Sequence, residues 1–149
     1  MQQTPQHPLA MLVEQKDWAT TPLGARELWP ASLVMCERLC LDSRFPIILF
    51  WGPELVQIYN DAYRPILGGR HPRALGQTAR ECWPDIWDEV GPMLYSVLEK
   101  GEATWSENLL LPIERDGIPE ERYFTFSYSP ARDGWKRSRP IDPGAAFCI

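Results

Sequence analysis

The segment from Phe45 to Arg64, FPIILFWGPELVQIYNDAYR, constrains the fold more than any other part of the chain. Its first seven residues are almost wholly apolar, which predicts a strand buried on both faces. The Gly-Pro pair that follows ends this strand, because glycine tolerates a positive φ and proline lacks an N–H. Residues 55–60 alternate and predict a second strand, and Asn60 or Asp61 is a good N-cap for a helix over residues 62–67. The segment therefore predicts a hairpin that leads directly into a helix.

The composition is that of one globular domain. The chain has 149 residues, of which 44% are hydrophobic and 23% charged. The net charge of −5 and the lack of a basic run argue against a nucleic-acid partner. The longest apolar run is far shorter than a membrane span, and residues 1–16 lack the apolar segment of a signal peptide. We therefore expect a cytoplasmic protein without membrane insertion.

Two further regions have helical patterns. Apolar residues recur at helical spacing over residues 30–41 and predict one amphipathic helix; they are Trp29, Leu33, Cys36 and Leu39 or Cys40. Thr78 and Glu81 have capping-box spacing at the start of a short helix. A longer amphipathic helix is then predicted to end at Lys100, where Gly101 fits the C′ position.

The C-terminal half predicts two long antiparallel strands. They cover residues 103–114 and 120–129, and Arg115-Asp116-Gly117 between them is a hairpin signal. The whole order is β-β-α-α-α-β-β. We therefore predict the α+β class, with an antiparallel sheet of about five strands, helices packed on one face and an N-terminal flanking helix.

Four segments in this order resemble PAS domains, and specifically the subgroup found near the N-terminus of bacterial hybrid histidine kinases. The segments are DWATTPLGARELWPASL, WGPELVQIYNDAYRPILG, ALGQTARECWPDIWDEVGPML and ERYFTFSYSPARD. The resemblance covers roughly residues 17–133. It implies a PAS domain over residues 17–149, in which residues 17–43 form the flanking segment and helix. Residues 1–16 are then expected to form a flexible tail.

The C-terminal end, residues 134–149, departs from the family pattern. It begins with a basic, proline-broken stretch that is poor strand material. A domain cut at its edge and an altered end would each give this pattern. Gly144-Ala145-Ala146-Phe147-Cys148-Ile149 still matches the family's last strand, and we predict that these six residues pair beside the first strand.

The resemblance implies a regulatory role and not catalysis. The phospho-accepting histidine and the ATP-binding motifs of a kinase are absent from this chain. Asp85, Asp88 and Glu89 cluster, but we expect them on the solvated side of a helix. The family implies a sensor domain of a two-component histidine kinase, with downstream kinase domains in the full-length protein and homodimerisation through the N-terminal helix and the sheet. The alternative is a structural interaction module that has no physiological ligand.

PAS domains can enclose a ligand between sheet and helices, and this chain is rich in aromatic residues, including seven tryptophans. Each candidate could instead fill the core. The residues that we expect to approach such a cavity are Phe50, Ile58, Tyr63, Trp83, Trp87, Trp105, Phe124 and Phe126.

No specific cofactor or metal is predicted. His71 precedes a proline between arginines, which favours a solvated loop histidine over a haem ligand. Cys82 lies in Arg-Glu-Cys-Trp-Pro, which does not match the segment of relatives that form a flavin adduct. Cys36 and Cys40 have no ligating partner nearby in the sequence, and we expect them to be small hydrophobic residues. The expected ligand is an unidentified small molecule.

Overall fold

The computed structural model describes residues 8–131 and the backbone of the strand at 146–148. Its helices are α1 (Leu9–Gln15), α2 (Ala31–Asp42), α3 (Arg64–Leu67), α4 (Ala79–Cys82) and α5 (Trp87–Lys100). Four single 3₁₀ turns accompany them: η1 (Trp18–Thr20), η2 (Arg26–Leu28), η3 (Asp61–Tyr63) and η4 (Gly68–Arg70). The strands are β1 (Ile48–Trp51), β2 (Val56–Tyr59), β3 (Ser106–Arg115), β4 (Ile118–Phe126), β5 (Tyr128–Pro130) and β6 (Ala146–Cys148).

The main sheet is antiparallel with the strand order β2-β1-β6-β5. The predicted position of the last strand is confirmed at residues 146–148, which pair with β1 on one side and β5 on the other. The remaining residues of the predicted atypical end, 134–145 and 149, lie outside the described residues.

The second hairpin, β3–β4, continues from this sheet. Asp116 and Gly117 form its two-residue turn with φ values of 54° and 79°, as a type I′ hairpin requires. The predicted strand over residues 120–129 is interrupted at Ser127, which separates β4 from β5. The N–H of Thr104 donates to the carbonyl of Tyr128 at 2.8 Å, so the start of this hairpin lies beside β5.

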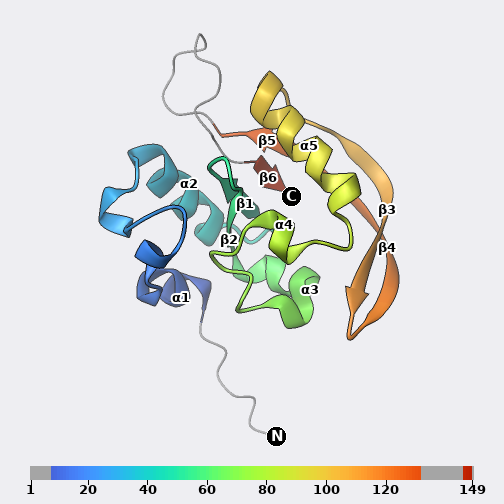
Figure 1. Cartoon of the computed structure of the whole chain (residues 1–149), viewed down its shortest axis with the longest axis horizontal. Helices are drawn as coiled ribbons and strands as arrows, with labels where there is room; N and C mark the ends of the chain where they lie inside the picture. The colour runs from blue at the N-terminus through green and yellow to red at the C-terminus, as the bar shows by residue number, and fades with distance from the viewer. Residues whose placement is uncertain (1–7, 132–145, 149) are drawn as a thin grey trace, which may run out of the picture.

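Helices cover both sides of the β1–β2 hairpin. Figure 1 shows α1 and α2 on one side of these strands and α3, α4 and α5 on the other. All four residues of β1 and all four of β2 are buried, as expected for strands covered on both faces. The prediction that the helices pack on one face is correct for α3–α5, while the flanking helix α2 packs on the opposite face of its own sheet. In α2, Leu33 and Cys40 are buried as predicted, but Leu39 is 61% exposed.

The prediction of a flexible tail over residues 1–16 is wrong for its second half. Residues Leu9–Gln15 form α1, and the side chains of Leu9 and Val13 are fully buried. The N–H of Leu9 donates to Asp61 Oδ1 at 3.1 Å, and Trp18 Nε1 donates to the carbonyl of Val13 at 2.8 Å. The long-range bond to Asp61 and the burial of Leu9 and Val13 hold α1 against the domain. In the part of the chain that the structure describes, no helix has the length and apolar character required to cross a bilayer.

Asn60 joins the elements that meet at the end of β2. It caps η3 as predicted, because its Oδ1 accepts from the N–H of Tyr63 at 3.2 Å. The same oxygen accepts from the N–H of Ile47 at 3.1 Å. Its Nδ2 lies within hydrogen-bond distance of three carbonyl oxygens, those of Cys40 (2.9 Å), Ser43 (3.2 Å) and Phe45 (2.7 Å). One buried amide therefore connects the end of α2, the entry to β1 and the start of η3.

Candidate ligand-binding site

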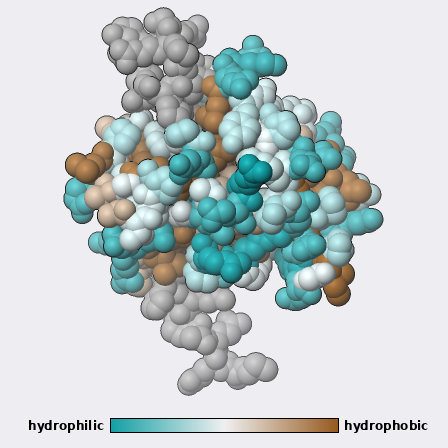
Figure 2. Space-filling model, viewed as in Figure 1, coloured by the Kyte–Doolittle hydropathy of each residue, from teal (hydrophilic) through white to brown (hydrophobic). Residues whose placement is uncertain are grey.

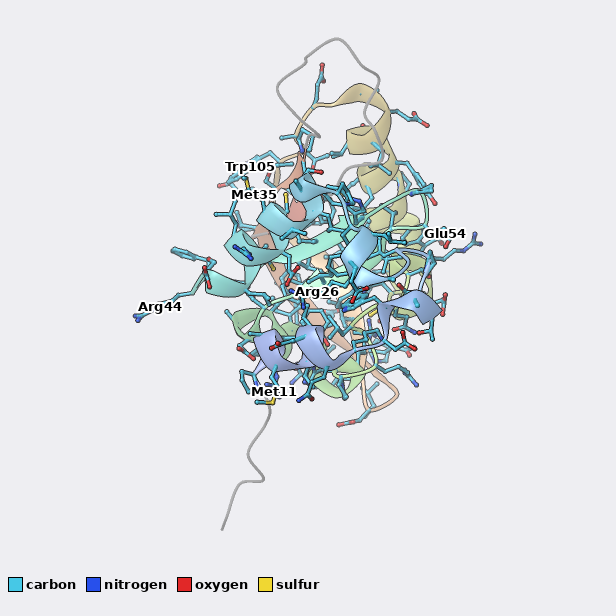
Figure 3. The ribbon with its side chains drawn as sticks, turned by 90° about the vertical axis from the view of Figure 1, so that its left-hand side faces the viewer. Met11, Arg26, Met35, Arg44, Glu54 and Trp105 are labelled. Carbon is cyan, nitrogen blue, oxygen red and sulfur yellow. The ribbon has the colours of Figure 1, made fainter. Side chains whose placement is uncertain are left out.

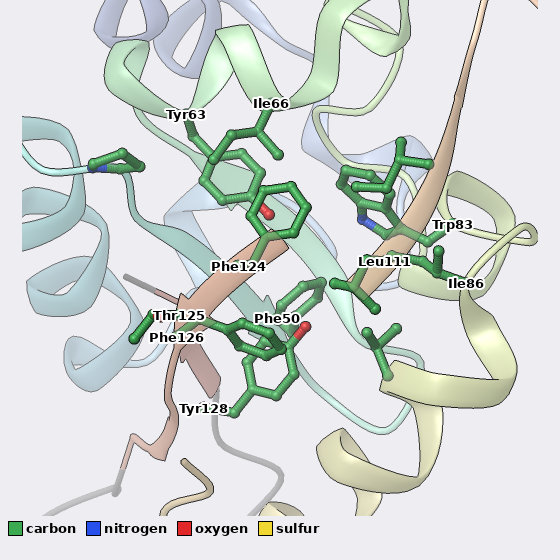
Figure 4. A pocket seen from close by; sticks show the side chains of 13 residues that line it. Phe50, Tyr63, Ile66, Trp83, Ile86, Leu111, Phe124, Thr125, Phe126 and Tyr128 are labelled. Carbon is green, nitrogen blue, oxygen red and sulfur yellow. The ribbon is translucent and has the colours of Figure 1, made fainter. Parts of the chain in front are cut away.

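A cavity of about 220 Å³, partly open to solvent, lies between the strands and helices α3–α5 (Figure 4). Six aromatic side chains contribute to its wall: Phe50, Tyr63, Trp83, Phe124, Phe126 and Tyr128. The other described lining residues are Pro46, Ile66, Ile86, Val90, Leu111, Ile113 and Thr125. The helices and the β3–β4 hairpin thus enclose an apolar and largely aromatic space.

Strand alternation places most of the sheet residues at the cavity. Phe124, Phe126 and Tyr128 follow one another at intervals of two, and Leu111 and Ile113 do the same on β3. The ring of Tyr128 makes edge contacts with those of Phe126, at 5.1 Å between centroids, and Phe50, at 5.9 Å. The aromatic cluster is therefore held together by its own contacts.

Five of the eight candidate residues are on the wall: Phe50, Tyr63, Trp83, Phe124 and Phe126. Their contact with a ligand stays a prediction. Tyr128 is not among the predicted cavity residues, although it continues the alternation of Phe124 and Phe126. The aliphatic residues from α5 and β3 were also omitted, because an aliphatic side chain at a cavity has the same sequence pattern as one in the core.

The other three candidates do not line the cavity. Ile58 pairs with Leu49 and lies on the opposite face of the sheet, next to Gln57, whose side chain is on the cavity side. Trp87 is half-buried at the start of α5, where its ring contacts that of Tyr95 at 6.0 Å. Trp105 precedes β3 and is 68% exposed, so its prediction as a cavity residue is wrong.

The indole of Trp83 is fixed by a buried hydrogen bond. Its Nε1 donates to Gln57 Oε1 at 2.7 Å, and Gln57 Nε2 donates to the carbonyl of Ala74 at 3.0 Å. Gln57 is fully buried, so both ends of its amide are used within the protein. Trp83 is therefore anchored by its polar atom and presents its ring to the cavity.

An ion pair lies behind Trp83. Arg70 Nη2 is 2.6 Å from Asp85 Oδ2, and the guanidinium lies over the Trp83 ring at 4.6 Å. Asp85 Oδ2 also accepts from the N–H of Glu114 at 2.8 Å. The expectation that Asp85 lies on a solvated face is wrong, because its side chain is only 8% exposed. The pair connects η4 and the segment before α5 to the β3–β4 hairpin.

Comparisons with known proteins support the fold. No family model matches the chain, and no curated protein does. Among solved structures, an RNA-binding light-oxygen-voltage receptor overlaps 84% of this chain at 18% identity and a TM-score of 0.51. The chain has a PAS fold. It spans 34% of that receptor's length. The PAS domain of the histidine kinase ThkA overlaps 69% of this chain and 94% of its own length, at 22% identity and a TM-score of 0.49.

His71 lies beside the PAS core and is not one of the described residues that line the cavity. Its Nδ1 is 2.7 Å from the hydroxyl of Tyr59. Burial and the nearby Arg64 lower the pKa of His71, while burial raises the pKa of Tyr59. The phenol and the imidazole are therefore both neutral and share one hydrogen bond, whose direction is set by the tautomer of the imidazole. The predicted solvated loop histidine is in fact half-buried and bonded to the core.

The described residues contain no group of three or more His, Cys, Asp or Glu side chains that could hold a metal ion. Cys40 is fully buried, and its thiol lies 3.6 Å from the carbonyl oxygen of Ile47. Burial raises the pKa of the Cys40 thiol to about 12, so this side chain is a protonated, small hydrophobic residue at neutral pH, as predicted.

The ion pair behind Trp83 predicts a loss of stability in acid. Burial acts to raise the pKa of Asp85, but the hydrogen bonds from Arg70 and the Glu114 N–H outweigh it, so the pKa is lower than in an unfolded chain. The contribution of Asp85 to the free energy of unfolding is therefore fully present above its unfolded pKa of about 4. It is lost as the pH falls through the lower pKa that Asp85 has in the folded protein.

The test compares the urea unfolding of wild type and Asp85→Asn from pH 7 down to pH values below the unfolded pKa. We expect the wild type to be more stable at pH 7 and the difference to shrink as the solution is acidified below about pH 4. Taking the difference removes titrations that the two proteins share, including that of Glu37, whose pKa is raised by burial. A difference that stays constant through this range would contradict the assignment.

Proposed function

We propose that the chain is the sensory domain of a two-component histidine kinase and that a small ligand occupies the cavity. The observation that supports this most directly is the cavity of about 220 Å³ between the sheet and the helices α3–α5. The sequence resemblance to the PAS domains of hybrid histidine kinases supplies the signalling context. In the full-length protein, downstream kinase domains would receive the signal.

Asn60 offers a route from the cavity to the flanking helix. Tyr63 is on the cavity wall, and its N–H donates to Asn60 Oδ1. The other end of the same amide donates to the carbonyls of Cys40 and Ser43 at the end of α2. A ligand that moves Tyr63 would therefore bias the position of α2. The shift is limited by the difference in the ligand's affinity for the two positions.

The second candidate function is a dimerisation module without a physiological ligand. Exposed apolar side chains favour it: Met35 and Leu39 on α2 are 66% and 61% exposed, and Trp105 is 68% exposed. Figure 3, which faces the α2 side, labels Met35 and Trp105 in the same region of the view. The face shown in Figure 2 is mostly hydrophilic, with hydrophobic residues in small separate groups. A second copy would cover the α2 side.

Native mass spectrometry of the freshly purified chain separates the two functions. For sensing, we expect an additional small-molecule mass on the wild-type protein. Val90→Phe fills the cavity and should remove this mass, whereas Glu89→Phe adds the same ring at an exposed neighbouring position on α5 and should retain it. A wild-type dimer that carries no additional mass would contradict sensing and favour the dimerisation module.

A further inference from the structure

The charge of the cavity wall restricts the ligand. None of the described lining residues carries a charged side chain. The charges of the ion pair behind Trp83 neutralise each other, because Arg70 Nη2 bonds to Asp85 Oδ2. Arg70 Nη1 and Asp85 Oδ1 are buried without a hydrogen-bond partner, but neither residue is among the described residues that line the cavity. A ligand with a carboxylate, phosphate or ammonium group would lose its hydration here without gaining a partner charge. The cavity is therefore suited to a neutral molecule.

The hydrogen-bonding groups of the wall restrict it further. No described lining residue has a side-chain amide, and the nearby amide of Gln57 is used by Trp83 and Ala74. A heterocycle with several donors and acceptors, such as a flavin or a nucleobase, needs several such groups along its edge. Apart from the indole N–H of Trp83, which Gln57 already accepts, the polar side-chain groups of the described lining residues are the hydroxyls of Tyr63, Tyr128 and Thr125. In Figure 4 the first two hydroxyls lie among the aromatic rings.

The volume of the cavity and the aromatic rings in its wall indicate the shape of the ligand. An apolar cavity of about 150 Å³, engineered in another protein, binds benzene. The cavity here is about 220 Å³, half as large again, which suits two fused rings better than one. Tyr128, Phe50 and Phe126 already contact one another edge to face. A planar aromatic ligand can extend that arrangement, because aromatic rings prefer edge-to-face and offset contacts.

We infer that the cavity takes a neutral, planar molecule of two fused aromatic rings with no more than one hydroxyl group. The inference rests on the proposed function, because it specifies the ligand class of the same site. The observation that carries it is the combination of six aromatic residues with no charged or amide side chain among the described lining residues.

The test uses 2-naphthol and 2-naphthoate, which share the ring system and differ in charge at neutral pH. Isothermal titration calorimetry on the whole chain should show 2-naphthol binding at least tenfold more tightly than 2-naphthoate. Val90→Phe should weaken 2-naphthol binding by tenfold or more, and Glu89→Phe should leave it unchanged. Because Val90→Phe could disturb folding, Leu111→Phe fills the cavity from β3 as an independent variant. The melting temperature of the wild type should rise with 2-naphthol.

Three results would overturn the inference. Equal or tighter binding of 2-naphthoate would show that charge is accepted, and the proposed sensory function would still stand. Binding of 2-naphthol that neither filling variant weakens would place it outside the cavity. Binding of neither probe would also reject the ligand class. In that case, an additional mass in native mass spectrometry would keep the sensory function, and its absence would remove both proposals.

Discussion

Replacing Asn60 with aspartate is expected to destabilise the domain by about 3–5 kcal/mol, the range for disrupting a buried network of polar groups. The substitution keeps the shape of the side chain and the acceptor that bonds the N–H groups of Ile47 and Tyr63. It replaces the Nδ2 donor with an oxygen, which would face three carbonyl oxygens at distances of 2.7–3.2 Å. A carboxylate is repelled there, and a protonated carboxyl group can satisfy only one of the three.

Urea unfolding at pH 7 measures this loss. Asn108→Asp is the matched control, because it makes the same chemical change at an exposed position of β3. The backbone there has a φ of 49°, which aspartate tolerates as asparagine does, so stability should change by less than about 0.5 kcal/mol. Equal stabilities of the two variants would show that the amide of Asn60 does not join α2 to the sheet. A smaller change in Asn60→Ala than in Asn60→Asp would confirm that repulsion adds to the lost hydrogen bonds.

Local chemistry made much of this fold predictable. Thr78 caps α4 by accepting from the N–H of Glu81, and Gly101 ends α5 in the left-handed region at φ 67°. The Asp116-Gly117 turn and the Asn60 cap follow the same principle. In each case the residue's own backbone or side-chain preference selects the structure, so a few neighbouring residues contain the whole signal.

The face of β2 that borders the cavity could not be predicted in this way. Gln57 is the polar residue between Val56 and Ile58, and alternation alone places it opposite to the core. In the structure it is fully buried, because Trp83, 26 residues away, donates to its side chain. Helices cover both faces of this strand, so hydrophobicity cannot identify the face that borders the cavity. Ile58 was placed at the cavity for this reason.

Pairing across the chain explains the other errors. Asp85 looked solvated within its own helix pattern, but Arg70 and the backbone of Glu114 reach it from two other elements. Leu9 and Val13 lie in a short and weakly patterned segment, and their burial depends on how α1 packs against the rest of the domain. Trp105 is a large aromatic residue of the kind that often lines cavities, but it lies just before β3 with most of its side chain exposed to solvent. A sequence pattern shows whether a position is apolar or polar, whereas the tertiary fold decides which other residues it contacts.

Trp83→Ala is expected to cost about 3–5 kcal/mol of stability, the range for truncating a buried tryptophan. The indole is 3% exposed, so its removal enlarges the cavity and loses its apolar contacts. It also leaves Gln57 Oε1 without its donor and removes the ring on which the Arg70 guanidinium lies. The buried amide and the ion pair behind the ring would both lose a partner, so the cost includes more than the volume of the side chain.

Two further variants separate these contributions in the same unfolding experiment. Trp83→Phe keeps an aromatic ring but removes the Nε1 donor, and should cost about 1–3 kcal/mol because Gln57 Oε1 stays buried and unsatisfied. Trp105→Ala is the control for removing an indole, and its 68% exposure predicts a change of less than about 0.5 kcal/mol. Trp83→Ala with wild-type stability would mean that Trp83 is a replaceable wall of the cavity. A large loss of stability in both Trp83 variants would instead mean that Trp83 holds β2 to the helices through Gln57. A ligand that contacts Trp83 would then act directly on the core of the domain.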